Sequence, residues 1–113
     1  MRIRTKAFAL RIVRLYASLP KATEAQVVGK QVLLRSGTSV GAHYREAKRA
    51  RSTPEFISKV EVELQELEET VYWLELLVDS GIVSAMRLED LHKEAEALTA
   101  ILVTSVKTAK KRC

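Results

Sequence analysis

Apolar residues recur at alternating steps of three and four along four stretches of this chain, and this periodicity is its most constraining feature. Such steps return to one face of an α-helix, whereas a half-buried strand would alternate every second residue. Proline or glycine interrupts the pattern between stretches, at Pro20, Pro54 and Gly81. The sequence therefore predicts amphipathic helices joined by short connections.

Three of the helices have clear predicted limits. The first spans residues 5–18, because Pro20 cannot donate a backbone hydrogen bond and so ends it. The third spans residues 54–79, and the fourth runs from residue 84 or 85 to about residue 110. The inward stripes are predicted to be Phe8, Ile12, Leu15 and Leu19; then Phe56, Val60, Leu64, Leu67, Val71, Leu74 and Val78; and finally Leu88, Leu91, Ala95, Leu98, Leu102, Ser105 and Ala109.

The ends of the third helix also carry recognisable signals. Thr53 is expected to cap its start, with Pro54 at the first helical position, where the missing N–H is harmless. Gly81 is expected to form a left-handed cap after its end.

The second helix is predicted over residues 24–50 and has an unusual middle. Thr23 and Gln26 fit a capping box at its start. Gly37 and Gly41 each cost roughly 1 kcal/mol relative to alanine inside a helix, so a loop is one interpretation. We favour a continuous helix whose small residues let another backbone approach closely.

Short connections favour antiparallel neighbours, so the predicted fold is an all-α, up-down-up-down four-helix bundle forming a single domain over residues 1–113. Apolar residues make up 47% of the chain, enough to fill a core. No run approaches the eighteen or so apolar residues of a membrane span, and the start does not resemble a signal peptide. Cys113 is the sole cysteine, so we expect no intramolecular disulfide and a cytoplasmic location.

The antiparallel order would gather basic residues at one end of the bundle. The net charge is only +5, but most acidic residues fall between residues 61 and 96, toward the middle and the other end. The basic candidates are Arg2, Arg4 and Lys6; Arg45, Lys48, Arg49 and Arg51; and Lys107, Lys110, Lys111 and Arg112.

A concentrated basic pole is the electrostatic footprint of a protein that binds RNA or DNA. Terminal lysines also solvate frayed ends and complement helix dipoles, which is the alternative for the last of these clusters. An acidic protein partner is a second alternative. Aromatic residues are scarce there apart from Phe8 and Tyr44, so we expect contacts to the nucleic-acid backbone rather than base stacking.

Enzymatic and metal sites find little support in the sequence. Glu89 and His92 have the Glu-x-x-His order of di-iron bundles, but that motif is needed twice and occurs once. Neither histidine has an acid placed to orient it as a base for a serine nucleophile. We therefore expect no catalytic residues, no metal and no cofactor.

Two further features point to polar packing or to self-association. Arg35, Ser39 and Glu46 share a polar stripe that forms either a buried ion-pair network with the third helix or a contact with another subunit. Tyr72 and Trp73 are adjacent, so at least one lies at the margin of the bundle, and Leu76 and Leu77 add apolar surface there. This surplus favours a homo-oligomer, the alternative being a wide apolar stripe in a fat bundle.

Two segments resemble a known family. Residues 31–47 (QVLLRSGTSVGAHYREA) and 66–77 (ELEETVYWLELL) are similar to small bacterial four-helix-bundle proteins encoded in intervening sequences of large-subunit ribosomal RNA genes. Phe8, Tyr16 and Leu19–Pro20 also fit. His43 departs from the pattern, since the family usually has asparagine there.

The resemblance extends to the accessory variability protein of diversity-generating retroelements. The resemblance implies that this chain forms a homopentamer with a basic surface, and that this surface binds nucleic acid and a reverse transcriptase. Fold alone does not confer function, so these implications stand as expectations for this chain.

Overall fold

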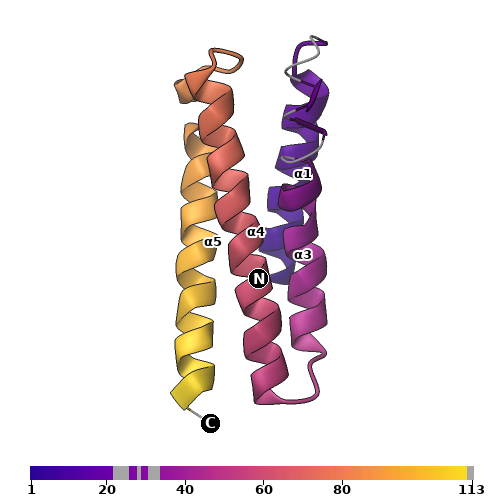
Figure 1. Ribbon diagram of the computed structural model, residues 1–113, viewed down its shortest axis with the longest axis vertical. Helices are drawn as coiled ribbons and strands as arrows, with labels where there is room; N and C mark the ends of the chain where they lie inside the picture. The colour runs from indigo at the N-terminus through magenta and orange to yellow at the C-terminus, as the bar shows by residue number, and fades with distance from the viewer. Residues whose placement is uncertain (22–25, 28, 31–33, 112–113) are drawn as a thin grey trace.

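The computed structural model describes residues 1–21, 26–27, 29–30 and 34–111, with the backbone alone at residues 34 and 35 (Figure 1). Its four long helices confirm the predicted all-α class, and they alternate in direction along the rod. They are α1 (Arg2–Ser18), α3 (Leu34–Lys48), α4 (Thr53–Asp79) and α5 (Ala85–Lys111).

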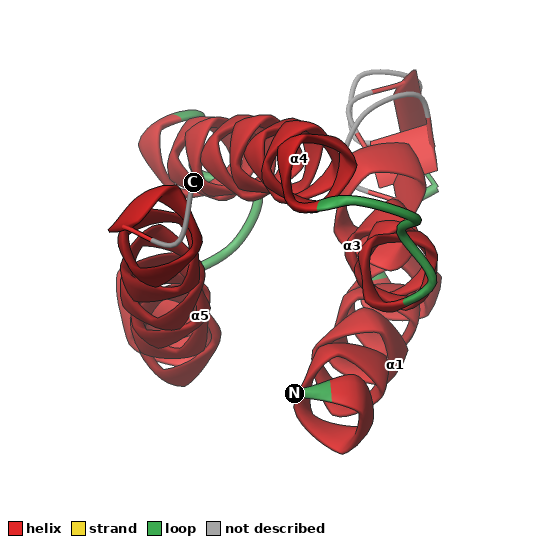
Figure 2. Ribbon diagram, turned by 90° about the horizontal axis from the view of Figure 1, so that it is seen from below, coloured by secondary structure: helices red, strands yellow, loops and turns green. Residues whose placement is uncertain are grey.

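The helices pack in chain order around an elongated core. α1 lies against α3, α3 against α4, and α4 against α5, while α1 and α5 meet more sparsely. Seen along the rod in Figure 2, the helices form a horseshoe with α1 and α5 at its two ends. The molecule measures 48 × 21 × 20 Å, as expected of long helices lying side by side. Among the described residues, no helix combines the length and hydrophobicity needed to cross a membrane.

The core confirms the predicted stripe of the first helix, and it shifts the stripe of the third. Phe8 and Ile12 of α1 are fully buried. In α4, four of the seven residues of the predicted stripe are only partly buried, because every second core position lies one residue earlier in the sequence than predicted. That line is Val60, Glu63, Leu67, Thr70, Leu74 and Leu77. In α5, Val106 is buried and the predicted Ser105 is half-buried.

The glycine-containing segment is helical, which confirms the continuous interpretation over the described part of the second helix. A Cβ added at Gly37 would lie 2.8 Å from Cγ1 of Ile12, so only glycine allows α1 to approach this closely. Gly41 is less crowded, since its Cβ would meet Thr5 Oγ1 at an ordinary 3.5 Å. The predicted start at Thr23 lies outside the described residues, and the Gln26 side chain contacts Tyr16 and Pro20.

The ends of α4 show one correction and one confirmation. Ser52, not Thr53, is the N-cap, because its Oγ accepts from the Glu55 N–H at 3.2 Å. This places Thr53 and Pro54 in the first turn of the helix. Gly81 has φ +78°, and Ile82 N–H bonds back to Leu77 O at 3.1 Å, as in a Schellman motif.

Candidate nucleic-acid interface

The antiparallel fold gathers basic side chains at one end of the rod, here named the basic pole. α3 and α5 both end there and α4 begins there, at the bottom of Figure 1. The described residues of the basic pole are Arg2, Arg45, Lys48, Arg49, Arg51, Lys107, Lys110 and Lys111.

Four of these cations surround one hollow. A pocket of about 490 Å³ lies between the start of α1 and the end of α3, and Met1, Arg2, Tyr44, Arg45, Lys48 and Arg49 line it. Lys48 Nζ lies 5.9 Å from the centre of the Tyr44 ring, a cation–π contact that holds the ammonium group at the rim. The hollow is open to solvent and is positive on several sides.

A larger groove adjoins this hollow because α1 does not extend to the lower end of the rod. α1 begins partway up the rod, so the lower end of the bundle has only three helices among the described residues (Figure 1). The groove has a volume of about 900 Å³ and is lined by Phe56 of α4, by Ile101 and several small residues of α5, and by Lys48 and Arg51. An apolar floor therefore lies beside the basic hollow.

Other predicted basic residues lie elsewhere. Arg4 is engaged in a bidentate ion pair with Glu94 of α5, at 2.7 and 3.0 Å. This pair raises the pKa of Arg4 and lowers the pKa of Glu94. Lys6 lies higher on α1 and is exposed. Within the basic pole, Lys110 is 3.5 Å from Glu61. Arg112 lies outside the described residues.

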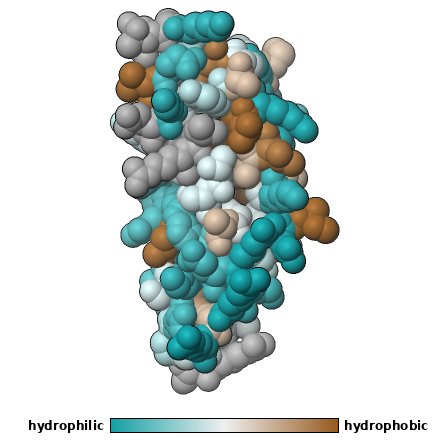
Figure 3. Space-filling view, turned by 90° about the vertical axis from the view of Figure 1, so that its right-hand side faces the viewer, coloured by the Kyte–Doolittle hydropathy of each residue, from teal (hydrophilic) through white to brown (hydrophobic). Residues whose placement is uncertain are grey.

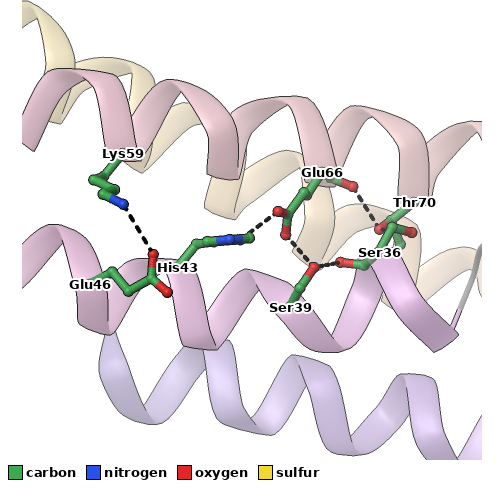
Figure 4. A network of polar contacts seen from close by, with 7 residues as sticks. All are labelled: Ser36, Ser39, His43, Glu46, Lys59, Glu66 and Thr70. Atoms are coloured by element: carbon green, nitrogen blue, oxygen red, sulfur yellow. Dashed lines mark hydrogen bonds and ion pairs between the residues drawn. The ribbon is translucent and has the colours of Figure 1, made fainter.

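The predicted polar stripe of α3 faces α4 within the same chain (Figure 4). The Ser39 hydroxyl contacts both the Ser36 carbonyl, at 3.0 Å, and the Glu66 carboxylate. His43 Nδ1 also lies against the Glu66 carboxylate, without the geometry of a regular hydrogen bond. The network favours the intrachain interpretation of this stripe, while the Arg35 side chain lies outside the described part.

The same network is anchored at both ends. Thr70 Oγ1 lies 3.0 Å from Ser36 Oγ and also donates to the Glu66 carbonyl at 2.8 Å. At the lower end, Lys59 Nζ is 3.5 Å from the Glu46 carboxylate. These contacts fix the register of α3 on α4, and they thereby fix the position of the α3 cations at the basic pole.

Glu63 is a buried acid whose place in the core was not predicted from the sequence. Its side chain is fully buried, and neither carboxylate oxygen has a hydrogen-bond partner among the described residues. Burial, and then the negative charge of Glu66, raise its pKa to about 8. Glu63 lies three residues after Val60 and four before Leu67, a helical spacing that indicates a core position. The many acidic residues around it made Glu63 look like one more exposed acid.

At least one residue of the aromatic pair lies at the margin of the bundle, as predicted. Tyr72 is 54% exposed, and its ring meets that of Trp73 edge-on with centroids 5.2 Å apart. Leu77 was expected to add to this apolar surface, but it is fully buried, because it belongs to the core line of α4.

Both residues of the Glu-x-x-His motif of α5 contact other charged or titratable side chains on the surface. His92 lies 3.3 Å from Glu96 and 3.7 Å from Glu75. Glu89 instead pairs with Lys93 at 3.0 Å. The two motif side chains thus point to different partners.

Comparison with known proteins identifies relatives of this fold. A solved structure from Bacteroides thetaiotaomicron VPI-5482, described as a protein of unknown function from the S23 ribosomal protein family, is 38% identical. The match covers 94% of this chain and 97% of that one, with a TM-score of 0.87. Among curated proteins, none matches this chain significantly. Residues 3–104 match the 23S rRNA-intervening sequence protein family, and the chain therefore belongs to that family.

Proposed function

We propose that this protein binds the backbone of RNA or DNA through its basic pole and acts as a non-enzymatic accessory protein. The observation that supports this most directly is the convergence of Arg2, Arg45, Lys48 and Arg49 around one open hollow. Cations that surround a hollow without acids among its described lining residues form a site for an anionic group such as a phosphate.

The chemistry of the basic pole favours recognition of charge over recognition of sequence. Among the described residues that line the hollow, Tyr44 is the only aromatic one, and its ring already contacts Lys48. Phosphate contacts orient a nucleic acid but carry no sequence information. Binding should therefore be strongly salt-dependent and weakly selective among sequences.

The family gives this proposal a context. Its description refers to intervening sequences of 23S ribosomal RNA, and an RNA partner is consistent with that origin. Support of a reverse transcriptase is the narrower form of the proposal, and it rests on the resemblance to retroelement accessory proteins.

The experiment is fluorescence anisotropy with labelled single-stranded RNA and DNA across a salt series. Affinity should fall steeply with salt. The variant Lys48→Glu/Arg49→Glu should flatten the log–log slope by roughly 1 to 1.5, because each phosphate that is no longer neutralised reduces the slope by about 0.7. Lys93→Glu is the matched control, because Lys93 is exposed but lies far from the basic pole in a pair with Glu89. Absence of binding at low salt, or an equal weakening in the control, would contradict the proposal.

A protein-interaction scaffold is the second candidate. The apolar groove beside Lys48 and Arg51 favours it, because an acidic amphipathic helix of a partner fits such a surface. This function would remain if the wild-type protein failed to bind RNA and DNA at low salt.

A further inference from the structure

The groove at the lower end of the rod combines apolar surface with positive charge. Phe56 and Ile101, each half-buried, supply the large apolar side chains, and Lys48 and Arg51 supply the charge. Among the described residues that line the groove, none is acidic. Its volume of about 900 Å³ falls within the range of pockets that hold small organic molecules. The groove therefore has the size and composition to receive an apolar ring carried by a negatively charged chain.

The groove and the hollow of the basic pole share one lining residue. Lys48 lines both, and its ammonium group lies 5.9 Å from the centre of the Tyr44 ring in the hollow. Lys48 and Arg51 make no ion pair within the described part of the chain. Figure 3 shows that hydrophilic side chains predominate toward the lower end of the face formed by α1 and α3. A chain whose phosphate lies in the hollow can therefore continue into the groove.

Hydroxyl groups along the groove offer hydrogen bonds without selecting one base. Thr104 and Ser105 each donate to a carbonyl of the preceding turn of α5, at 3.0 Å, so both oxygens can still accept. Ser52 Oγ accepts from the Glu55 N–H and keeps its own hydrogen to donate. All four bases present donors or acceptors at their edges. Such a lining tolerates different bases.

The groove is long enough for more than one base. Its α5 wall runs from Ala100 to Ala109, which is roughly 14 Å of helix. Successive bases of one strand rise by about 3.4 Å, so a wall of this length spans a few of them. In a duplex the bases are paired and stacked inside the helix and cannot reach a protein pocket. Only an unpaired strand can therefore fill the groove.

We propose that the groove receives unpaired bases of a single-stranded RNA or DNA whose phosphates lie in the hollow. This inference rests on the proposed function and narrows its ligand to a single strand. The phosphates still orient the strand, and the groove adds contacts to the faces of the bases, which raise affinity without reading sequence. Charge alone would not favour a single strand, because the phosphates of a duplex are more densely spaced.

The experiment compares three labelled DNA probes of equal length by fluorescence anisotropy: an ordinary single strand, the same strand without bases, and a duplex. The wild type should bind the ordinary strand at least about fivefold more tightly than the abasic strand, the effect of one base stacked on an aromatic ring. This ratio should change little as salt is raised, because salt screens the phosphate contacts that both strands share and not the apolar contact.

Ala100→Gln/Thr104→Gln is the decisive variant, because it fills the groove with uncharged side chains at two exposed positions. Affinity for the ordinary strand should fall to that for the abasic strand, while the affinities for the abasic strand and the duplex stay unchanged. Ala85→Gln/Met86→Gln, at exposed positions near the opposite end of α5, is the matched control and should leave all three affinities unchanged. Circular dichroism checks that both variants keep their helices.

The failure of this inference is distinguishable from that of the proposed function. If the wild type binds the ordinary and abasic strands equally, the groove receives no base, although the basic pole still binds phosphate. An affinity for the ordinary strand that the groove variant leaves unchanged would also overturn the inference and leave the groove to a protein partner. Equal weakening of all three probes in that variant would overturn it too. Absence of binding to every probe at low salt would overturn the proposed function and this inference with it.

Discussion

Replacing Glu63 by glutamine should remove a pH dependence of stability that the buried carboxyl group imposes. The folded protein holds the pKa of Glu63 at about 8, against an ordinary value of 4.5. Below about pH 4.5 the Glu63 carboxyl group is protonated in both the folded and the unfolded state, so its ionisation does not change the free energy of unfolding. Between the two pKa values only the folded state keeps the proton, so raising the pH lowers the free energy of unfolding.

The size of the effect follows from that interval. Each pH unit costs about 1.4 kcal/mol, so the decrease accumulates to the order of 4 kcal/mol between about pH 5 and about pH 9. Above the folded pKa the penalty is complete and no longer grows. Glu66 and His43 are the titratable groups of the adjoining network, so the relevant quantity is the difference between wild type and variant.

The assay is urea unfolding of wild type and Glu63→Gln at several pH values across this range. The variant should gain stability relative to wild type as the pH rises, while Glu68→Gln, an exposed change on the same helix, should follow the wild type. Parallel stability curves for wild type and Glu63→Gln would refute the assignment of Glu63 as a neutral, buried acid.

Four substitutions test the backbone features of the fold by chemical unfolding. Gly37→Ala should destabilise by about 1–2 kcal/mol, because its Cβ would meet Ile12 at 2.8 Å, whereas Gly41→Ala should be neutral or should stabilise by up to about 1 kcal/mol. Equal effects at the two glycines would argue against close packing of α1 on α3. Ser52→Ala should cost about 1 kcal/mol by removing the cap on Glu55 N–H, and an unchanged stability would remove Ser52 as the N-cap. Gly81→Ala should cost roughly 1 kcal/mol, since its φ of +78° is strained for alanine, and an unchanged midpoint would contradict that conformation.

The periodicity of the sequence was sufficient to predict the helices, and the short connections were sufficient to predict that they alternate in direction. Pro20 and Gly81 ended helices where expected, because their effects are local to the backbone. The exact core line of α4 was harder to predict. Its stripe is wide, and the burial of Glu63 and Thr70 depends on how α4 is rotated against its neighbours, which the sequence of one helix does not determine.

The basic pole was predictable in outline, because chain order alone brings the ends of α3 and α5 together. The height at which α1 begins was not predictable from charge. Arg4 consequently pairs with Glu94, and Lys6 lies on the outer face of α1. The hollow around Arg2 and Lys48 depends on that height and on the packing of α1 against α3.

The most direct test of the basic pole is to observe which amide signals of the isotopically labelled protein shift when single-stranded RNA is added at low salt. We expect shifts at the start of α1, at the end of α3 and in the connection that contains Arg51, with the region around Glu68 and Glu69 of α4 unchanged. Shifts confined to α4, or no shifts at all, would contradict the assignment of the basic pole as a nucleic-acid interface.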